Sequence, residues 1–500
     1  MHPYAAVRSR GTHELPRSLV CRLVSAAGDC LARSGCAIGA WSLRGVGLAT
    51  LVTLFACGDP ITSGDGAAIL DASLDLTTPA DAASLPEDTS IGLDLASGDS
   101  SAITDLPRSD LSAITDLAVR DAATAPLDLA SPDLSPPLAC PVGSSLALDT
   151  RASCASPPAS APAALVSAQA AATRGDVLTL GGLSPGAAPC VPLVVCIPAS
   201  AHTLVFSDDP ESPATDGVLY ADVIGPGEYR VYVYHTSASA SLRKFPVVML
   251  NQGTSAVHAT IERAGIAGPG SDYVGIGKSA VASWLAGAGT GVVTVPPSTR
   301  VLLSSALDSL HAGNGQLVHA IIDLSLDGPV KLSVVSVGAT TDATTATAGL
   351  ALLPYDGAHQ RGTFAGADRL LLSASLDGAR SLELGAGATD PPLAGHDYVD
   401  GTSMSLLGNY GVDYRVSLSL GRAFGFVLAP RGGGWGGGAR LPPGSDSSTA
   451  LVSLPAASSS LDSTTQGISV GNYAAGVATI ELMSAGGSSR PIDLVSVPLP

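Results

Sequence analysis

The sequence is poor in basic residues and in aromatic ones. Of its 500 residues, 25 are Lys or Arg and 43 are Asp or Glu, which gives a formal net charge of −18. A chain this acidic lacks the cationic surface that binds phosphates, so nucleic acid is excluded as a partner. Aromatic residues make up 4% of the chain, whereas 57 glycines and 36 prolines predict many turns and few long helices.

No apolar run near the N-terminus is long enough to cross a membrane. The run at 45–56, GVGLATLVTLFA, suits the hydrophobic part of a secretory signal, and it follows a leader with six arginines. It ends in Leu54-Phe55-Ala56-Cys57, which resembles the bacterial lipobox, in which the cysteine is acylated. We therefore expect 1–57 to be a lipoprotein-type signal peptide, with Cys57 lipidated and the membrane as a partner through this anchor. A buried helix or an uncleaved anchor is the alternative.

The next segment, 58–137, has no Phe, Trp or Tyr. It carries fourteen aspartates and one glutamate against two arginines, and the hexapeptide SAITDL occurs twice, at 101–106 and 112–117. Such a low-complexity, self-repelling segment predicts a disordered linker. Calcium binding is the sharper alternative, but calcium loops need carboxylates one residue apart, and here they recur about every five or six residues.

Four cysteines follow the linker: Cys140, Cys154, Cys190 and Cys196. An even number of cysteines in an exported chain predicts two disulfides, and three pairings are possible. A zinc site would need close C-x-x-C pairs, which this spacing does not supply. We expect no metal and no cofactor.

Alternation of apolar and polar residues dominates the rest of the chain. Val412, Tyr414, Val416, Leu418 and Leu420 alternate with polar residues, as expected of a half-buried strand. Many short strands with frequent turn signals predict an all-β fold of two tandem antiparallel β-sandwich (Ig-like) domains. The expected divisions are a small Cys/Pro/Ala-rich segment at 138–198, one sandwich at 199–340 and another at 350–500. One brief helix is expected at 278–287.

Several short blocks in 202–500 are similar to known sequences. They are 206–211 (FSDDPE), 217–220 (GVLY), 272–273 (DY), 295–297 (VPP), 361–369 (RGTFAGADR) and 408–412 (GNYGV). Together they resemble a family of secreted bacterial surface proteins, many of which are labelled by an attached copper amine oxidase-like N-terminal (stalk-type) domain. We do not expect that module in this chain, where the lipobox and the linker take its place. The resemblance implies export and a β-rich fold but no known activity.

Oxidase chemistry does not follow from that label. An amine oxidase makes its quinone from the tyrosine of T-x-x-N-Y-D/E, and the sequences around Tyr410 and Tyr473 lack the threonine and the acid. His311 and His319 lie eight residues apart, and we expect such histidines to be solvated rather than to bind a metal. The sequence predicts no enzyme activity.

One glycine-rich segment is a candidate ligand site. Trp435 stands between six glycines, with Arg431 and Arg440 on either side, so a loop could present the indole to a sugar or a partner. The alternative is a hairpin tip whose tryptophan folds back onto the sandwich. The nearest approach to a catalytic carboxylate pair is Asp397 and Asp400, which flank Tyr398.

Two functional hypotheses remain. The first is a lipid-anchored envelope protein, expected in the outer membrane, with a structural, adhesive or partner-binding role and surface proteins as partners. The second is a glycan-binding surface module, with hydrolysis less favoured because aromatic residues are few. The sequence leaves the oligomeric state open.

Overall fold

The computed structural model describes residues 38–42, 51–55 and 138–500, apart from 288, 290, 386–388 and 442–449. The chain divides into two units, 1–127 and 128–500. In the first unit, β1 (Ile38–Ser42) pairs antiparallel with β2 (Leu51–Phe55). Cys57 and the linker 58–137 lie outside the described residues, so what we predict of them stays a prediction.

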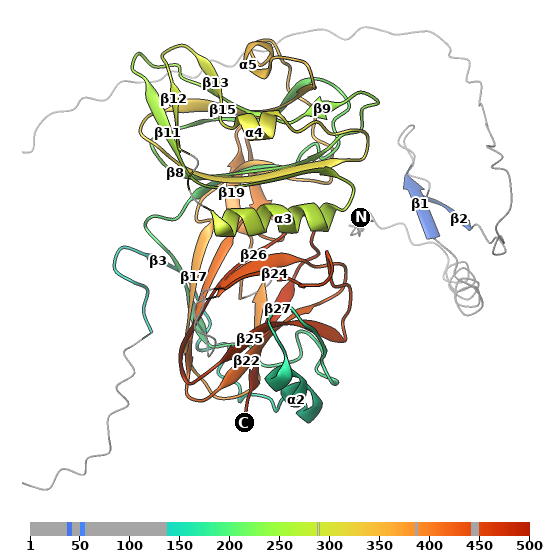
Figure 1. Ribbon diagram of the computed structural model, residues 1–500, viewed down its shortest axis with the longest axis vertical. Helices are drawn as coiled ribbons and strands as arrows, with labels where there is room; N and C mark the ends of the chain where they lie inside the picture. Colours follow the sequence, from blue (N-terminus) through green and yellow to red (C-terminus); the bar gives the residue numbers. More distant parts are fainter. Residues whose placement is uncertain are drawn as a thin grey trace, which may run out of the picture. The chain divides into compact units, whose positions relative to one another are not determined.

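Strands dominate the second unit, which confirms the all-β prediction. Four sheets form two face-to-face pairs, called here sandwich A and sandwich B (Figure 1). Sandwich A has a five-stranded sheet of β13 (Arg300–Leu302), β10 (Val247–Leu250), β15 (Val330–Gly338) and β7 (Gly217–Ile224), with β9 (Arg243–Lys244) also on β15. Its eight-stranded sheet runs β12 (Gly291–Val295), β11 (Val257–Gly270), β14 (Leu317–Leu326), β8 (Gly227–Thr236), β6 (Thr203–Ser207), β16 (Arg361–Phe364), β19 (Leu393–Asp397), β20 (Thr402–Leu406).

Sandwich B is built in the same way. Its seven-stranded sheet runs β24 (Ala450–Leu454), β23 (Gly437–Leu441), β26 (Gly476–Ser484), β21 (Asp413–Leu420), β17 (Asp368–Leu376), β5 (Leu193–Ile197), β3 (Ser145–Asp149). Its five-stranded sheet runs β18 (Ser381–Leu384), β27 (Ile492–Pro498), β22 (Phe424–Pro430), β25 (Gln466–Tyr473), β4 (Val177–Thr179). Neighbouring strands are antiparallel except for the pairs β6–β8 and β17–β21.

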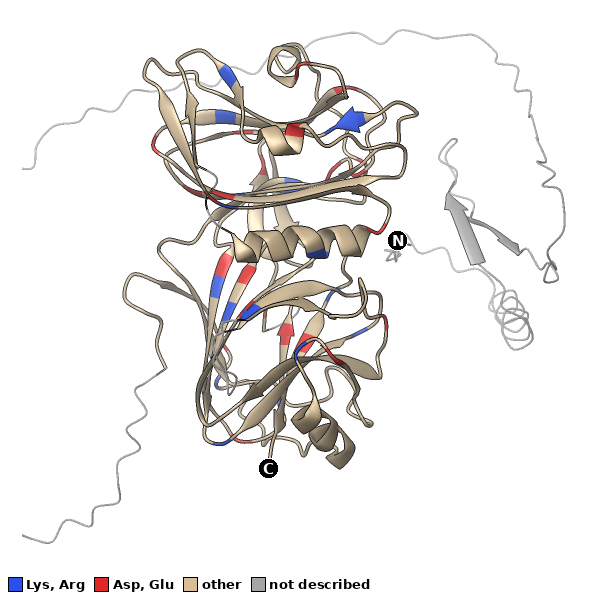
Figure 2. Cartoon of the chain, in the orientation of Figure 1, with Lys and Arg blue, Asp and Glu red and all other residues tan. Residues whose placement is uncertain are grey.

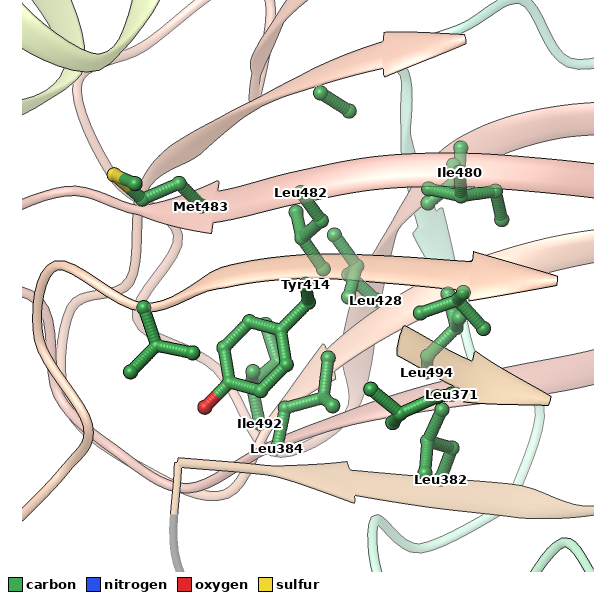
Figure 3. Packing of buried hydrophobic residues seen from close by; sticks show 14 of the residues in the cluster. Leu371, Leu382, Leu384, Tyr414, Leu428, Ile480, Leu482, Met483, Ile492 and Leu494 are labelled. Atoms are coloured by element: carbon green, nitrogen blue, oxygen red, sulfur yellow. The ribbon is translucent and has the colours of Figure 1, made fainter. Parts of the chain in front are cut away.

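Alternation along the strands produces the core, as β21 illustrates. Tyr414, Val416 and Leu418 are buried, whereas Arg415 and Ser419 face solvent. Figure 3 shows side chains of β17, β21 and β26 meeting those of β18, β22 and β27 between the two sheets of sandwich B. The strand predicted at 412–420 is therefore confirmed, and its apolar face lies where the period of two places it.

Sheet membership does not follow the divisions expected from the sequence. The segment 138–198, expected to precede the sandwiches, supplies β3, β4 and β5 to sandwich B. Strands β16, β19 and β20, from the stretch 350–500, belong to sandwich A. The chain therefore passes back and forth between the sandwiches, because each sheet is completed by strands that are distant in sequence.

Helix α3 (Tyr273–Ala286) lies between the two sandwiches (Figure 1). It begins five residues before the expected start, where the side chain of Asp272 accepts a hydrogen bond from the Gly275 N–H at 3.0 Å. Gly265 of β11 lets the helix approach closely, since a Cβ there would collide with the Ala280 carbonyl oxygen. Trp284 of α3 is fully buried, and the guanidinium groups of Arg230 and Arg263 each lie 4.6 Å from its ring.

The other helices were not expected. Helix α2 (Ala163–Ala171) begins after Pro162 and packs Leu165 on the outer side of β22 and β27. Its alanines favour a helix, although the surrounding prolines concealed it in the sequence. Among the described residues, the remaining helices are the single turns α4 (Ser305–Asp308) and α5 (Ala343–Ala346).

Charged residues are sparse in both sandwiches, and Figure 2 shows acidic and basic positions side by side where strands of sandwich B approach α3. Arg230 of β8 meets Asp368 of β17 there at 2.9 Å, and Arg263 of β11 meets Glu481 of β26 at 3.0 Å. Both ion pairs join sandwich A to sandwich B.

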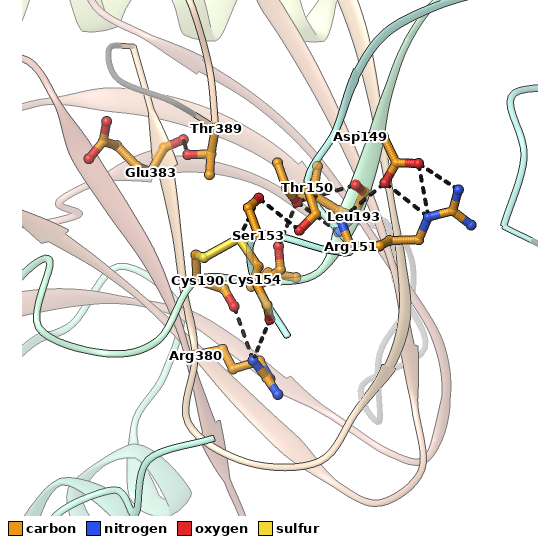
Figure 4. Close-up of a disulfide and its surroundings, with 11 residues drawn as sticks. Asp149, Thr150, Arg151, Ser153, Cys154, Cys190, Leu193, Arg380, Glu383 and Thr389 are labelled. Atoms are coloured by element: carbon orange, nitrogen blue, oxygen red, sulfur yellow. Dashed lines mark hydrogen bonds and ion pairs between the residues drawn. A yellow bond between two sulfur atoms is a disulfide. The ribbon is translucent and has the colours of Figure 1, made fainter. Parts of the chain in front are cut away.

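The two predicted disulfides are present, and they are nested. Cys140 pairs with Cys196, and Cys154 pairs with Cys190 inside that loop. Figure 4 shows Arg380 donating to the carbonyl oxygens of both Cys154 and Cys190, at 3.4 and 3.1 Å. Of the three pairings that the sequence allowed, this one ties the N-terminal part of sandwich B to β5.

Removal of either disulfide should destabilise sandwich B. The bonds close loops spanning 36 and 56 residues, so we expect each paired Cys→Ser replacement, Cys154 with Cys190 or Cys140 with Cys196, to lower the free energy of unfolding by about 2–4 kcal/mol. Urea denaturation measures this loss. A non-reducing peptide map that joins Cys140 to Cys154 or Cys190 would contradict the pairing.

Candidate binding site

The glycine-rich segment that the sequence offered as a ligand site buries its tryptophan in the core. Trp435 is fully buried, and its indole N–H donates to Ser484 Oγ at 3.0 Å. Arg431 is paired with Asp493 and Glu383, and Arg440 with Glu481. The indole is therefore not available to stack on a ligand, and its position matches the alternative of a tryptophan folded back onto the sandwich.

The glycines around Trp435 allow the chain to pack closely against the Trp435 ring and against α3. A Cβ at Gly437 would lie 2.9 Å from the Trp435 ring, and one at Gly438 would lie 2.9 Å from Val281 of α3. Side chains at these positions would push the segment away from both the tryptophan and the helix. The glycines, which suggested a loop that exposes Trp435, instead let the backbone pack closely against the tryptophan and α3.

The carboxylates beside Tyr398 are counter-ions of a buried arginine. Arg361 of β16 donates from Nε to Asp397 at 2.9 Å and from Nη2 to Asp400 at 2.8 Å, and its Nη1 lies 3.3 Å from Asp209. Arg361 and Asp209 have no exposed side-chain surface. Burial raises the pKa of Asp209 to about 7, against the opposing effects of the Asp356 N–H and of Arg361. The group is an ion-pair network and not a pair of free catalytic acids.

A pocket of about 630 Å³ opens beside this network. It lies along β7, the last strand of the five-stranded sheet of sandwich A. The loop at 350–352 and the turn after β19 form its other walls. Its lining is mainly aliphatic. The lining residues are Val218, Ala221, Asp222, Val223, Lys331, Leu350, Leu352, Tyr398 and Val399.

Arg361 holds three walls of this pocket together. Besides the turn that carries Asp397 and Asp400, it donates to the carbonyl oxygens of Leu219 in β7, at 3.2 Å, and of Leu353 after the loop, at 3.3 Å. One buried side chain thus fixes the strand, the loop and the turn relative to one another. The pocket is preorganised, because the hydrogen bonds of Arg361 already hold its three walls in place.

A second chain of hydrogen bonds positions the polar lining. The hydroxyl groups of Tyr220 and Thr363 lie 2.8 Å apart, and Thr363 donates to Asp222 Oδ2 at 2.7 Å. Asp222 is therefore held in place through Thr363 and the buried Tyr220.

The pocket exposes apolar side chains beside an unpaired strand edge. Val223 is 61% exposed, Leu352 41% and Tyr398 58%. Val218 forms an isolated bridge with Leu352, and beyond it no strand within 138–500, as far as those residues are described, pairs with the outer edge of β7. Exposed apolar groups beside a free edge are typical of a surface that binds another molecule.

Sequence reasoning found only one part of this site. It singled out Asp397 and Asp400, which flank Tyr398, but it did not connect that turn with β7, Lys331 or Leu352. These segments share no local motif, and the long-range contacts of Arg361 bring them together. The prediction for His319 was wrong: the ring is fully buried between Tyr232 and Tyr234, with centroids 4.7 and 5.4 Å away.

One group of side chains has the donors that a metal requires. Single donor atoms of His202, Glu228 and Glu262 all lie within 4.8 Å of one another. The group lies near the junction of the two sandwiches, since His202 follows β5 of sandwich B and both glutamates are on strands of sandwich A.

Two comparisons with known proteins found no match to this chain. It matches no protein-family model, and no curated protein is significantly similar to it. The resemblance to secreted bacterial surface proteins therefore stays a prediction.

Loss of the Arg361 side chain should destabilise the pocket walls together. In an Arg361→Met variant, Asp209 and Asp397 stay buried without their cation, and we expect the free energy of unfolding to fall by about 3–5 kcal/mol. Denaturant titration measures the change. Arg151→Met is the control, because Arg151 pairs with Asp149 at the surface and its loss should change stability little. Equal effects of the two variants would contradict the role of Arg361.

Proposed function

We propose that this chain is a non-catalytic, exported cell-envelope protein that binds a partner through the pocket beside β7. The observation that carries the proposal is the combination of a preorganised pocket, a free strand edge and three exposed apolar side chains, Val223, Leu352 and Tyr398. The two sandwiches form the scaffold that presents this surface.

Export is supported by the cysteines. Two disulfides indicate an oxidising compartment, as expected outside the cytoplasm. Among the described residues, no helix has the length and apolar character needed to span a membrane. The proposed attachment to the envelope, and to the outer membrane in particular, rests on the sequence pattern at Cys57 and the acidic linker that follows it.

A protein segment in an extended conformation is the partner that suits the pocket best. An edge strand can accept a further strand through main-chain hydrogen bonds, while adjacent pockets take alternate side chains. Here the pocket adjoins the edge of β7, and six of its nine lining residues are Val, Leu or Ala. An apolar side chain of the added strand would be buried there, with Lys331 and Asp222 at the margin.

A glycan is the second candidate, and Tyr398 favours it. The ring is more than half exposed and lines a pocket that also holds Asp222 and Lys331, so a sugar could stack on the ring and bond both charged groups. The aliphatic character of the remaining lining favours the peptide.

Photocrosslinking in the exporting cell distinguishes the pocket from the rest of the surface. A benzoylphenylalanine at Val223 should give a discrete crosslinked protein, whereas the same probe at Val477, an exposed valine of β26 in sandwich B, should not. Adding Tyr398→Ala should reduce the Val223 product severalfold, since exposed tyrosines often carry binding energy.

Identical products at both positions would contradict the pocket as the binding surface. If the Val223 probe captures no protein while the purified chain binds a glycan array in a Tyr398-dependent way, the glycan candidate replaces the peptide.

The anchor has its own test. Intact-mass analysis of the native protein should find acylation at Cys57, and Cys57→Ala should release the protein from the membrane fraction, because the lipid supplies the attachment. An unacylated chain whose location does not change in the variant would contradict a lipoprotein, but it would leave the pocket proposal standing.

A further inference from the structure

His202, Glu228 and Glu262 come from three separated parts of the chain. His202 lies in the connection between β5 and β6, Glu228 in β8 and Glu262 in β11. Strand β14 separates β8 from β11, and its Asp323 lies beneath the group. The Nε2 atom of His202 is 3.5 Å from Glu262 Oε2 and 3.7 Å from Asp323 Oδ2.

An irregularity in strand β11 turns the side chain of Glu262 toward His202 and Glu228. The register between β11 and β14 shifts between Ile261 and Arg263, so Glu262 is the extra residue of a β-bulge. A bulge redirects one side chain of an otherwise regular strand, and bulges are common beside functional sites. Its neighbour Arg263 is paired with Glu481 instead.

Two of the atoms in the group that could bind a metal are buried from water and have no hydrogen-bond partner. These are His202 Nε2 and Glu228 Oε2. A buried polar atom without a hydrogen bond is costly, so two such atoms in one group call for an explanation.

The other side of the histidine is fixed in the way that metal ligands are. Its Nδ1 lies 2.6 Å from Asp368 Oδ2, which also accepts the His202 backbone N–H at 2.8 Å. Asp368 in turn accepts from Arg230 at 2.9 Å. A carboxylate on Nδ1 leaves the Nε2 lone pair free and orients the ring, as it does for histidines that bind metals.

We propose that His202, Glu228 and Glu262 bind a divalent transition-metal ion, with Asp368 orienting the histidine. One imidazole nitrogen and two carboxylate oxygens suit Mn²⁺, Fe²⁺ or Zn²⁺. Glu262 is 41% exposed, so the site faces solvent on one side and has room for water as a further ligand. The ion would join the β5–β6 connection to β8 and β11, next to the Arg230–Asp368 pair between the sandwiches.

Mn²⁺ titration followed by electron paramagnetic resonance tests the site. Mn²⁺ is the probe because carboxylates favour it, whereas the thiols near the N-terminus are softer ligands. We expect wild type to bind one equivalent and Zn²⁺ to displace it. His202→Ala should weaken binding at least tenfold, by comparison with the 10–100-fold effect of losing an outer-shell partner. Glu262→Gln, at an exposed side chain, should do the same without disturbing the fold.

The control is His258→Ala. His258 also holds an aspartate on Nδ1, Asp327 at 2.7 Å, but it is exposed and outside the group, so its loss should leave binding unchanged. Mn²⁺ should also raise the melting temperature of wild type but not that of Glu262→Gln. No binding by wild type, or equal losses in His202→Ala and His258→Ala, would overturn the proposal. The unpartnered Nε2 would then be explained by a proton shared with the glutamates.

Discussion

The arrangement of the two sandwiches depends on the contacts of one buried group, the guanidinium of Arg230. It is 1% exposed and bonds Asp323 of its own sheet, Asp368 at the start of β17 and the carbonyl oxygen of Gly411 before β21. It also stacks on Trp284 of α3. Burial of a charge is costly unless its partners are complete, and the positions of all these groups are therefore coupled. Arg230 and His202 together hold the pKa of Asp368 below its usual range, although burial alone would raise it.

Arg361 fixes the walls of the pocket in the same way that Arg230 fixes the junction between the sandwiches. In each case one arginine in a strand of the eight-stranded sheet gathers carboxylates and carbonyl oxygens from segments distant in sequence. Only 14% of the chain is charged, yet these arginines are buried at the positions where segments must meet. The planar, five-donor guanidinium suits this role because it can satisfy several acceptors at once. Both the proposed binding pocket and the proposed metal site lie beside such a centre.

Local pattern was sufficient to predict the fold class but not the sites. The alternation at 412–420 predicts a strand because one face must be buried, and an even number of cysteines predicts disulfides without choosing their pairing. Neither signal indicates that 138–198 completes sandwich B, since that depends on contacts between distant residues, such as Gln169 and Ser469, which lie 300 positions apart. His202, Glu228 and Glu262 form no motif in sequence. Both interpretations of the segment around Trp435 stayed open there, because glycine can mean either a mobile loop or a tightly packed one.

The outer disulfide has a mechanical consequence. The described part of the second unit begins at 138, and Cys140 is bonded to Cys196 at the end of β5, inside the seven-stranded sheet. A pull on the chain ahead of Cys140 would therefore pass through the covalent bond directly into β5, which is held by β3 and β17 on either side. The residues between the two cysteines, with α2 and β4, would carry none of that load. A protein held to an envelope by its N-terminal side could bear force there without unravelling its first strands.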